Sequence, residues 1–272
     1  MSQNTQETDS GPEPAEDQAQ LAYVTAFGRG LAVIRTFSRS RPSLTIAEVA
    51  RETGLNRSTA RRFLHTLEID GYARCENGRY TLSPSILELG YSYLSTMSVD
   101  SIFQVQLHDL AETLHESCSA GVLDNHDVVF VARARTSFPR IMTLALSVGS
   151  RVPAYLTAIG RVLLAELDDE GLDAYLRTAA FQRETERTIT DPGQLREVVM
   201  GVRDRGYCLM DQEIEVGVCA VSVPVRQPNR PTIGISVAVH ASRTSVEAIE
   251  RDYLPALLET AAGIEHVLTL RN

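Results

Sequence analysis

Arginine, serine and histidine side chains gather on one face of a helix predicted over about residues 57–69. At 100° per residue, the apolar stripe of this helix leaves Ser58, Arg62 and His65 on the opposite side. In the major groove of DNA, an arginine can donate two hydrogen bonds to O6 and N7 of guanine, and hydroxyl groups can meet bases or phosphates. The spacing therefore predicts a helix that reads DNA, and the simpler alternative is a solvated helix face.

The predicted contacts extend beyond this face. Arg57 and Arg61 lie beside it and are better placed for backbone phosphates. Arg74 and Arg79 flank a predicted hairpin, from which they can reach phosphates or the minor groove. Arg79 can instead pair with Glu76 at the surface, an interaction of little energy. The full set of predicted DNA contacts is Arg57, Ser58, Thr59, Arg61, Arg62, His65, Arg74 and Arg79.

A second group of residues is suited to bind an anion. Thr157 is placed to cap a helix whose first amides, those of Ala158, Ile159 and Gly160, have no partner within the helix. Free amides at a helix N-terminus attract anions, and a glycine lets a ligand come close. These residues predict a carboxylate site, and the alternative is an ordinarily packed helix with water on its amides.

A strand predicted over residues 232–240 can form a wall of the same site. Every second residue from 234 to 240 is small or weakly polar, Ser236 among them, and the residues between them are β-branched. A strand face of small groups either meets a close neighbour or leaves a cavity. Arg133 and Arg151 are candidate partners for a carboxylate, and each can instead form an ordinary surface ion pair.

The cysteines and histidines do not form a metal-binding pattern. The cysteines are Cys75, Cys118, Cys208 and Cys219. None is part of a Cys-x-x-Cys motif, so we expect free thiols in a reducing compartment, no metal and no cofactor. Cys219 as a nucleophile with His240 is an enzyme alternative. Because Cys219 lies in an apolar strand and no nucleophile-elbow motif is present, we do not expect an enzyme.

Charge is distributed unevenly along the 272 residues, whose formal net charge is -9. Residues 1–20 contain acids and no basic residue, and residues 84–272 are also acidic. Residues 21–83 hold an excess of arginine over acids. One basic segment inside an acidic protein is typical of a module that contacts DNA.

Local signals in the basic segment predict a winged helix-turn-helix. Thr45 and Glu48 form a capping box at the start of a helix. Gly54 can end that helix in the left-handed conformation, and Asn56 can cap the DNA-facing helix. Asn77-Gly78 predicts a tight two-residue hairpin. Helices, turn and hairpin in this order are typical of the winged helix-turn-helix.

The second half of the chain predicts a mixed α and β domain. A helix over about 84–97 connects the two halves, and its wide apolar surface either packs on its own chain or forms a dimer contact. Further predictions are a helix over 102–118, a strand over 141–148 and a helix opened by a capping box at Thr244 and Glu247. Short links between strands predict a mainly antiparallel sheet with helices on its flanks.

Several motifs, in order over about residues 26–270, resemble those of IclR-type regulators. They are Phe27-Gly28-Arg29-Gly30-Leu31, Thr45-x-x-Glu48-Val49-Ala50, Gly54-Leu55-x-Arg57-Ser58-Thr59, Gly71-Tyr72 with Tyr80-x-Leu82, residues 149–155 and 157–165, and Asp211-x-Glu213-x-x-x-Gly217 with Cys219-Ala220 and Pro224-Val225. The stretches 137–142 and 151–155 resemble the branch that regulates protocatechuate, 4-hydroxybenzoate and β-ketoadipate catabolism.

The resemblance implies a winged helix-turn-helix followed by a GAF-like effector domain, assembled as a dimer or a dimer of dimers. It also implies that the effector pocket involves Asp211, Cys219 and Ser236. Some members have a second serine where this chain has Ala238, which leaves room for a larger ligand than a very small polar acid.

The sequence therefore predicts an α+β protein with an acidic disordered tail (1–20), a DNA-binding domain (21–83), a linker helix (84–99) and a GAF-like effector-binding domain (100–272). We expect a cytoplasmic transcriptional regulator, because no apolar stretch has the length of a membrane span. Its partners would be a double-stranded operator with an inverted repeat and a small carboxylate, either an aromatic acid or a β-ketoadipate-like intermediate. The alternative is a dimeric DNA-binding protein that responds to no ligand.

Overall fold

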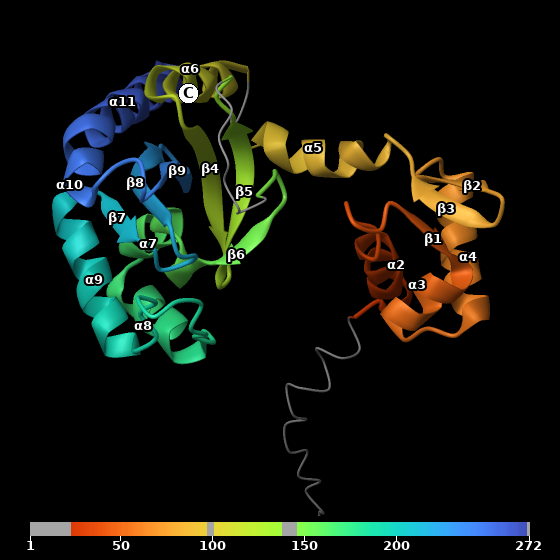
Figure 1. Cartoon of the computed structure of the whole chain (residues 1–272). Coiled ribbons are helices and arrows are strands. Elements are labelled where there is room, and N and C mark those ends of the chain that lie inside the picture. Colours follow the sequence, from red (N-terminus) through yellow and green to blue (C-terminus); the bar gives the residue numbers. More distant parts are fainter. Residues whose placement is uncertain (1–22, 97–100, 138–145, 271–272) are drawn as a thin grey trace, which may run out of the picture. The chain divides into compact units, whose positions relative to one another are not determined.

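The computed structural model describes residues 23–96, 101–137 and 146–270, and Figure 1 shows its helices and strands. The chain forms two compact units, one ending at Tyr91 and the next starting at Ser92, and each is described by itself. The predicted tail lies outside the described residues, and the predicted domain limits stay predictions. Within the described ranges, no helix combines the length and apolar character needed to cross a membrane.

The first unit consists of helices and a small sheet. In order, its elements are α2 (Thr25–Arg35), β1 (Ser43–Thr45), α3 (Ile46–Thr53), α4 (Arg57–Ile69), β2 (Ala73–Glu76) and β3 (Arg79–Leu82), followed by α5 (Ile86–Thr96), which continues into the second unit. The three strands are antiparallel in the order β1-β3-β2. This is the predicted winged helix-turn-helix.

Local hydrogen bonds fix the ends of these elements. The Glu48 amide donates to Thr45 Oγ1 over 3.3 Å, and the Thr45 amide donates to Glu48 Oε2 over 2.7 Å, so the capping box is confirmed. Gly54 ends α3 with φ 70°, and Asn56 Oδ1 accepts from the Thr59 amide. Asn77-Gly78 has φ values of 52° and 76°, both positive, as a two-residue hairpin requires.

The helices pack on a small core under the strands. Val33 of α2, Val49 of α3 and Leu64 of α4 are fully buried in it. Leu44 and Tyr80 from β1 and β3 close the core from the other side. The apolar stripe of each helix therefore faces its neighbours, and the opposite face of α4 remains exposed.

We expect Thr45→Ala to destabilise the first unit by about 1 kcal/mol, because it removes the acceptor for the Glu48 amide. Chemical denaturation of the full chain, followed by a probe placed in the first unit, measures the change. Thr45→Ser keeps the hydroxyl and should behave like the unmodified chain. Equal stability of the alanine and serine variants would show that this cap contributes nothing.

The second unit contains one sheet and several helices. In order, its elements are α6 (Ser101–Leu114), β4 (Ser117–Asp124), β5 (Asp127–Ala134), β6 (Arg151–Pro153), the 3-10 turn η1 (Ala154–Leu156), α7 (Ala158–Ala165), α8 (Asp169–Thr178), α9 (Pro192–Arg205), β7 (Cys208–Asp211), β8 (Val218–Gln227), β9 (Arg230–His240), α10 (Val246–Ala248), the π-helical turn η2 (Ile249–Tyr253) and α11 (Leu254–Leu270). The sheet order is β6-β5-β4-β9-β8-β7, and every strand pair is antiparallel. The predicted α+β class is thereby confirmed.

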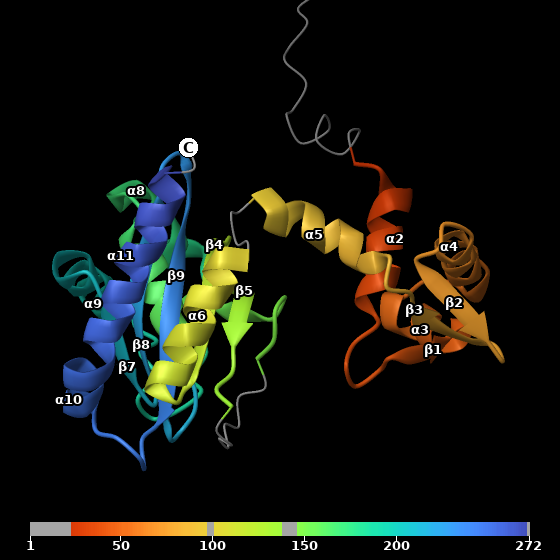
Figure 2. The same cartoon turned by 90° about the horizontal axis from the view of Figure 1, so that it is seen from above.

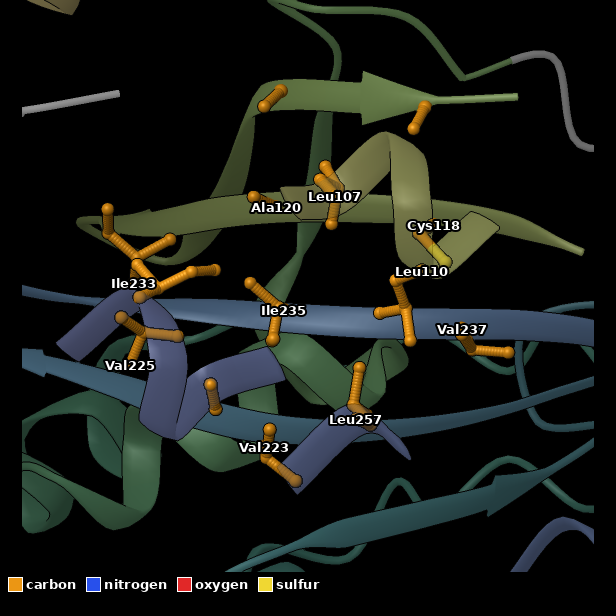
Figure 3. Packing of buried hydrophobic residues seen from close by; sticks show 14 of the residues in the cluster. Leu107, Leu110, Cys118, Ala120, Val223, Val225, Ile233, Ile235, Val237 and Leu257 are labelled. Atoms are coloured by element: carbon orange, nitrogen blue, oxygen red, sulfur yellow. The ribbon is translucent and has the colours of Figure 1, made fainter. Parts of the chain in front are cut away.

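Helices cover both faces of this sheet. Figure 2 shows α6 and α11 on one face and α8 and α9 on the other. Helix α7 packs with α8 and α9 on that second face. Figure 3 shows the first of these packing layers, in which Ile233, Ile235 and Val237 of β9 meet Leu110 of α6 and Leu257 of α11. The β-branched face of β9 therefore belongs to the hydrophobic core, and its small-residue face points to the α7 side.

Three sequence predictions need correction. The helix predicted to reach Cys118 ends at Leu114, and Cys118 belongs to β4, whose first six residues are all buried. The Thr244–Glu247 box is wrong, since the cap is Ser245, whose side chain accepts from the Ala248 amide. The strand predicted over 141–148 lies mostly outside the described residues, and residues 146–148 are not in a strand.

Candidate functional site

The face of α4 predicted to read DNA is exposed in the first unit. Ser58, Arg62 and His65 are all exposed, whereas Ala60 and Leu64 are buried. The guanidinium groups of Arg57, Arg61, Arg62 and Arg74 form no hydrogen bond or ion pair with another described residue; His65 lies 3.6 Å from Glu68. Because these four guanidinium groups have no partner among the described residues, they are available to bind phosphates or bases.

Arg79 is held differently from the other predicted DNA contacts. Its Nε donates to Ser43 Oγ over 3.1 Å and its Nη2 to the Ser43 carbonyl over 2.7 Å. Nη2 also lies 3.6 Å from Glu48 Oε2 of the capping box. Glu76 is opposite Arg79 in the hairpin, but among the described residues the two form no ion pair. Arg79 therefore ties the wing to β1 and to the start of α3, a role that the sequence did not indicate.

A cavity lies on the α7 side of the sheet in the second unit. Its volume is about 60 Å³. By the same measure, a single water molecule needs roughly 10–15 Å³, so the cavity has room for more than one water. Its apolar lining comes from Phe130, Leu146, Leu156, Met210, Ile214 and Val218. A mostly apolar cavity with a few converging polar groups is typical of a small-molecule site.

Two rows of side chains cross the sheet on the cavity side. In one row, Arg133 of β5 is opposite Ser119 of β4, and Ser119 is opposite Ser236 of β9. The members of the other row are Ser117, Ala238, Ala220 and Met210. Opposite residues share a face of the sheet, and all seven side chains line the cavity. The register thus gathers one guanidinium and three hydroxyl groups.

Arg133 is the cationic group of the cavity. Its Nε is buried and has no hydrogen-bond partner among the described residues. Burial lowers the pKa of the Arg133 guanidinium from its usual value, and the charge of Arg135 lowers it further. A buried donor without a partner is costly, and a carboxylate entering the cavity could accept from it.

The start of α7 forms another part of the wall. Thr157 caps the helix, and its Oγ1 accepts from the Gly160 amide over 2.8 Å. The amides of Ala158 and Ile159 have no hydrogen-bond partner among the described residues, and both residues line the cavity. Two free amides therefore remain available to an anion.

The glycine of this helix start has a different role from the predicted one. A Cβ at Gly160 would lie 2.0 Å from the Ala154 carbonyl oxygen. The glycine is therefore required because η1 of its own chain packs against it, and its amide is already bound to Thr157. Gly160 is not one of the described residues that line the cavity.

The face of β9 that carries small residues was expected either to meet a close neighbour or to leave a cavity. It does both, at different positions along the strand. A Cβ at Gly234 would lie 2.7 Å from Ile159 Cγ2. The glycine lets α7 lie against the sheet there. Two and four residues further along, Ser236 and Ala238 border the cavity.

Besides Gly160, three predicted effector residues lie away from the cavity. Asp211 is opposite Cys219 in the sheet, on the face turned away from Met210 and Ala220. There the Cys219 thiol donates to Asp211 Oδ1 over 3.2 Å, and Asp211 also pairs with Arg187. Arg151 binds the carboxylates of Asp124 and Asp127, which flank the β4–β5 turn. Of the two roles expected for Arg151, the structure therefore shows the surface ion pair.

The acid that does reach the cavity is Glu213. Arg161 of α7 donates to both of its carboxylate oxygens, over 2.7 and 2.6 Å, and Arg161 is 1% exposed. Arg161 Nε also donates to the Tyr155 carbonyl over 3.0 Å. This pair joins residues 52 positions apart, so no local signal predicts it.

Sequence reasoning also missed Ser117, Ser119 and Phe130. The alternation of Ser117 and Ser119 is the available signal, but the predicted helix over 102–118 covers Ser117 and ends just before Ser119. Because β4 is buried on both faces, its sequence shows no clear strand period.

The geometry does not support the enzyme alternative. His240 is opposite Val218, and therefore points to the other side of the sheet from Cys219. Burial raises the pKa of the Cys219 thiol, which disfavours the nucleophilic thiolate. In the part of the chain that the structure describes, no group of three or more His, Cys, Asp or Glu side chains is placed to hold a metal ion.

Comparison with known proteins identifies both units. Residues 26–76 match the model of the IclR helix-turn-helix domain, and residues 91–266 match that of the bacterial transcriptional regulator IclR C-terminal domain. The Pca regulon regulatory protein of Pseudomonas putida is 36% identical over 247 residues, covering 90% of this chain and 84% of that protein.

Solved structures agree with this match. A transcriptional regulator of Rhodococcus sp. RHA1 is 44% identical with a TM-score of 0.82, covering 92% of this chain and all of that one (100%). A double mutant of the PobR inducer-binding domain from Acinetobacter, in complex with 3-hydroxybenzoic acid, is 31% identical with a TM-score of 0.57. It covers 60% of this chain and 95% of that one. On these matches, the chain belongs to the IclR family of bacterial transcriptional regulators.

Proposed function

We propose that this chain binds operator DNA through α4 and that a small carboxylate in the cavity modulates that binding. The effector would be an aromatic acid or a β-ketoadipate-like intermediate of aromatic catabolism. The observation that carries the proposal is the buried Arg133 Nε, which has no hydrogen-bond partner among the described residues and lies in a mostly apolar cavity. Such a regulator works in the cytoplasm, where the DNA is.

The lining of the cavity favours an acid with an apolar body. Arg133 and the free amides of Ala158 and Ile159 supply donors for a carboxylate. Phe130 and the aliphatic side chains around it can contact a ring. The double mutant of the PobR inducer-binding domain, a relative of this chain, forms a complex with 3-hydroxybenzoic acid, which is an acid with an apolar ring.

A thermal-shift series tests the effector role. Binding to the folded state raises the apparent melting temperature, by an amount that grows with ligand concentration. We expect benzoate-type acids or β-ketoadipate to raise it, and the corresponding amides to do so far less because they lack the charge. If no acid stabilises the protein while it still binds DNA, the ligand-independent alternative is correct.

For DNA recognition, we expect Arg62→Ala to weaken operator binding by roughly 1–3 kcal/mol and to relax base preference at one position of each half-site. The reason is that Arg62 is exposed on the outer face of α4 and has no ion-pair partner among the described residues. Fluorescence anisotropy on an operator and on single-base variants measures both effects. Arg177→Ala, the same charge change at an exposed position of α8, should leave both unchanged. A uniform loss of affinity on all sequences would place Arg62 on phosphate instead.

A homodimer or dimer of dimers on an inverted repeat fits the surface of α5. Leu87, Leu89, Tyr91 and Tyr93 of this helix are all exposed, with Leu87 at 71% and Tyr91 at 70%. Exposed apolar side chains on one helix favour a contact with another subunit. Analytical ultracentrifugation of the protein, alone and with operator DNA, measures the assembly.

A further inference from the structure

The cavity has opposite charges at its two ends. Arg133 enters it from β5, and Glu213 enters it from the segment that follows β7. In the sheet order, β4, β9 and β8 lie between β5 and β7. Strands in a sheet are spaced by about 4.8 Å, so β5 and β7 are roughly 19 Å apart along the sheet, before the side chains reach inward. A ligand whose carboxylate meets Arg133 therefore directs its other end toward Glu213.

The Glu213 carboxylate is held rigidly. Oε2 accepts from Arg161 and from the Ile189 amide, and Oε1 accepts from Arg161. Thr188 Oγ1 donates to the Glu213 carbonyl over 2.7 Å, which fixes the backbone as well. Among the described residues Oε1 accepts one hydrogen bond, and a carboxylate oxygen has room for a second donor.

The cation beside Glu213 is already committed. Arg161 uses Nη1 and Nη2 for Glu213 and Nε for the Tyr155 carbonyl. Its charge is therefore balanced by Glu213, and this end of the cavity offers an acceptor but, among the described residues that line it, no free cation. A second carboxylate placed here would face the Glu213 carboxylate directly, and like charges so close are strongly unfavourable.

We propose that Glu213 restricts the cavity to acids that carry a single carboxylate and, at the opposite end, a neutral hydrogen-bond donor such as a hydroxyl group. The inference rests on the proposed function, because it takes the carboxylate of the ligand to lie at Arg133. The donor binds Glu213 Oε1. Dicarboxylates, β-ketoadipate-like acids among them, are rejected at this end, so the inference selects the aromatic acid from the two proposed effector classes.

Isothermal titration of the full chain with matched acids tests the restriction. Terephthalate and its monoamide, 4-carbamoylbenzoate, have nearly the same shape, but only the monoamide is neutral and a donor at the far end. We expect the monoamide to bind at least about tenfold more tightly than terephthalate, and 4-hydroxybenzoate about tenfold more tightly than benzoate. Equal affinities within both pairs, or tighter binding of terephthalate, overturn the inference. If none of the four acids binds, the proposed effector function itself fails.

A variant pair tests the residue. Arg161→Met with Glu213→Leu replaces the buried ion pair by apolar side chains, which a folded protein often tolerates. The ratio between monoamide and terephthalate should then fall to at most a few-fold. Glu215→Gln removes an acid two residues away that does not line the cavity, and should keep the ratio of the unmodified chain. A double variant with an unchanged ratio would show that Glu213 does not make the selection.

Discussion

Arg161→Met is expected to destabilise the second unit by about 3–5 kcal/mol, because it leaves the Glu213 carboxylate buried without its cation. The side chains of Arg161 and Glu213 are only 2% and 10% exposed, so water cannot replace the lost partner. The methionine also removes the donor to the Tyr155 carbonyl, which connects α7 to η1. Urea denaturation of the full chain, followed by a probe in the second unit, measures the shift in midpoint.

Two further variants separate the ion pair from a general effect of losing an arginine. Arg177→Met makes the same change at an exposed position of α8 and should alter stability by no more than about 0.5 kcal/mol. The double variant Arg161→Met with Glu213→Leu should recover much of the loss, since no unpaired charge remains. An unfolding midpoint of Arg161→Met equal to that of the unmodified chain would contradict the assigned role of the pair.

Arg133→Met is expected to weaken binding of a carboxylate effector by about 10- to 100-fold, the value of hydrogen bonds to a charged group. Stability without ligand should stay the same or rise, because the arginine Nε has no partner among the described residues and its burial is costly. Methionine has similar length and flexibility, so it can fill the same space. Titration calorimetry and thermal shift with the same acid measure the two effects.

The matched control for this second prediction is Arg151→Met. Arg151 binds Asp124 and Asp127 outside the cavity, so its loss should leave acid affinity unchanged. Both arginines were candidates from the sequence, and the two variants therefore decide between them. Loss of acid binding in Arg151→Met, with normal binding in Arg133→Met, would show that the carboxylate lies elsewhere.

Much of the first unit could be predicted because its signals are local. The capping box of Thr45 and Glu48 and the hairpin at Asn77-Gly78 each depend on residues at most three positions apart. The exposed face of α4 follows from the helical period alone. By contrast, the attachment of Arg79 to Ser43 joins residues 36 positions apart, and the sequence suggested a nearer partner.

The cavity was only partly predictable, for the same reason. Alternation along β9 placed Ser236 on the small-residue face, and the Thr157 cap was visible in the sequence. Which strand lies beside which was not visible, so the row from Arg133 through Ser119 to Ser236 could not be drawn. Asp211 and Cys219 were attributed to the pocket by resemblance, whereas the register turns both to the other face of the sheet.

The sequence by itself determined most of the elements, most of their caps and the faces of the most regular helices and strands, because these depend on hydrogen bonds and periodicities within a few residues. Only the tertiary structure decided which charges share the cavity. Arg133 lines it from β5 and Glu213 from the segment after β7, and Arg161 reaches Glu213 across 52 positions of sequence. Strand order, register and the approach of α7 to the sheet bring these groups together, and each of them arises from packing between segments that are distant along the chain.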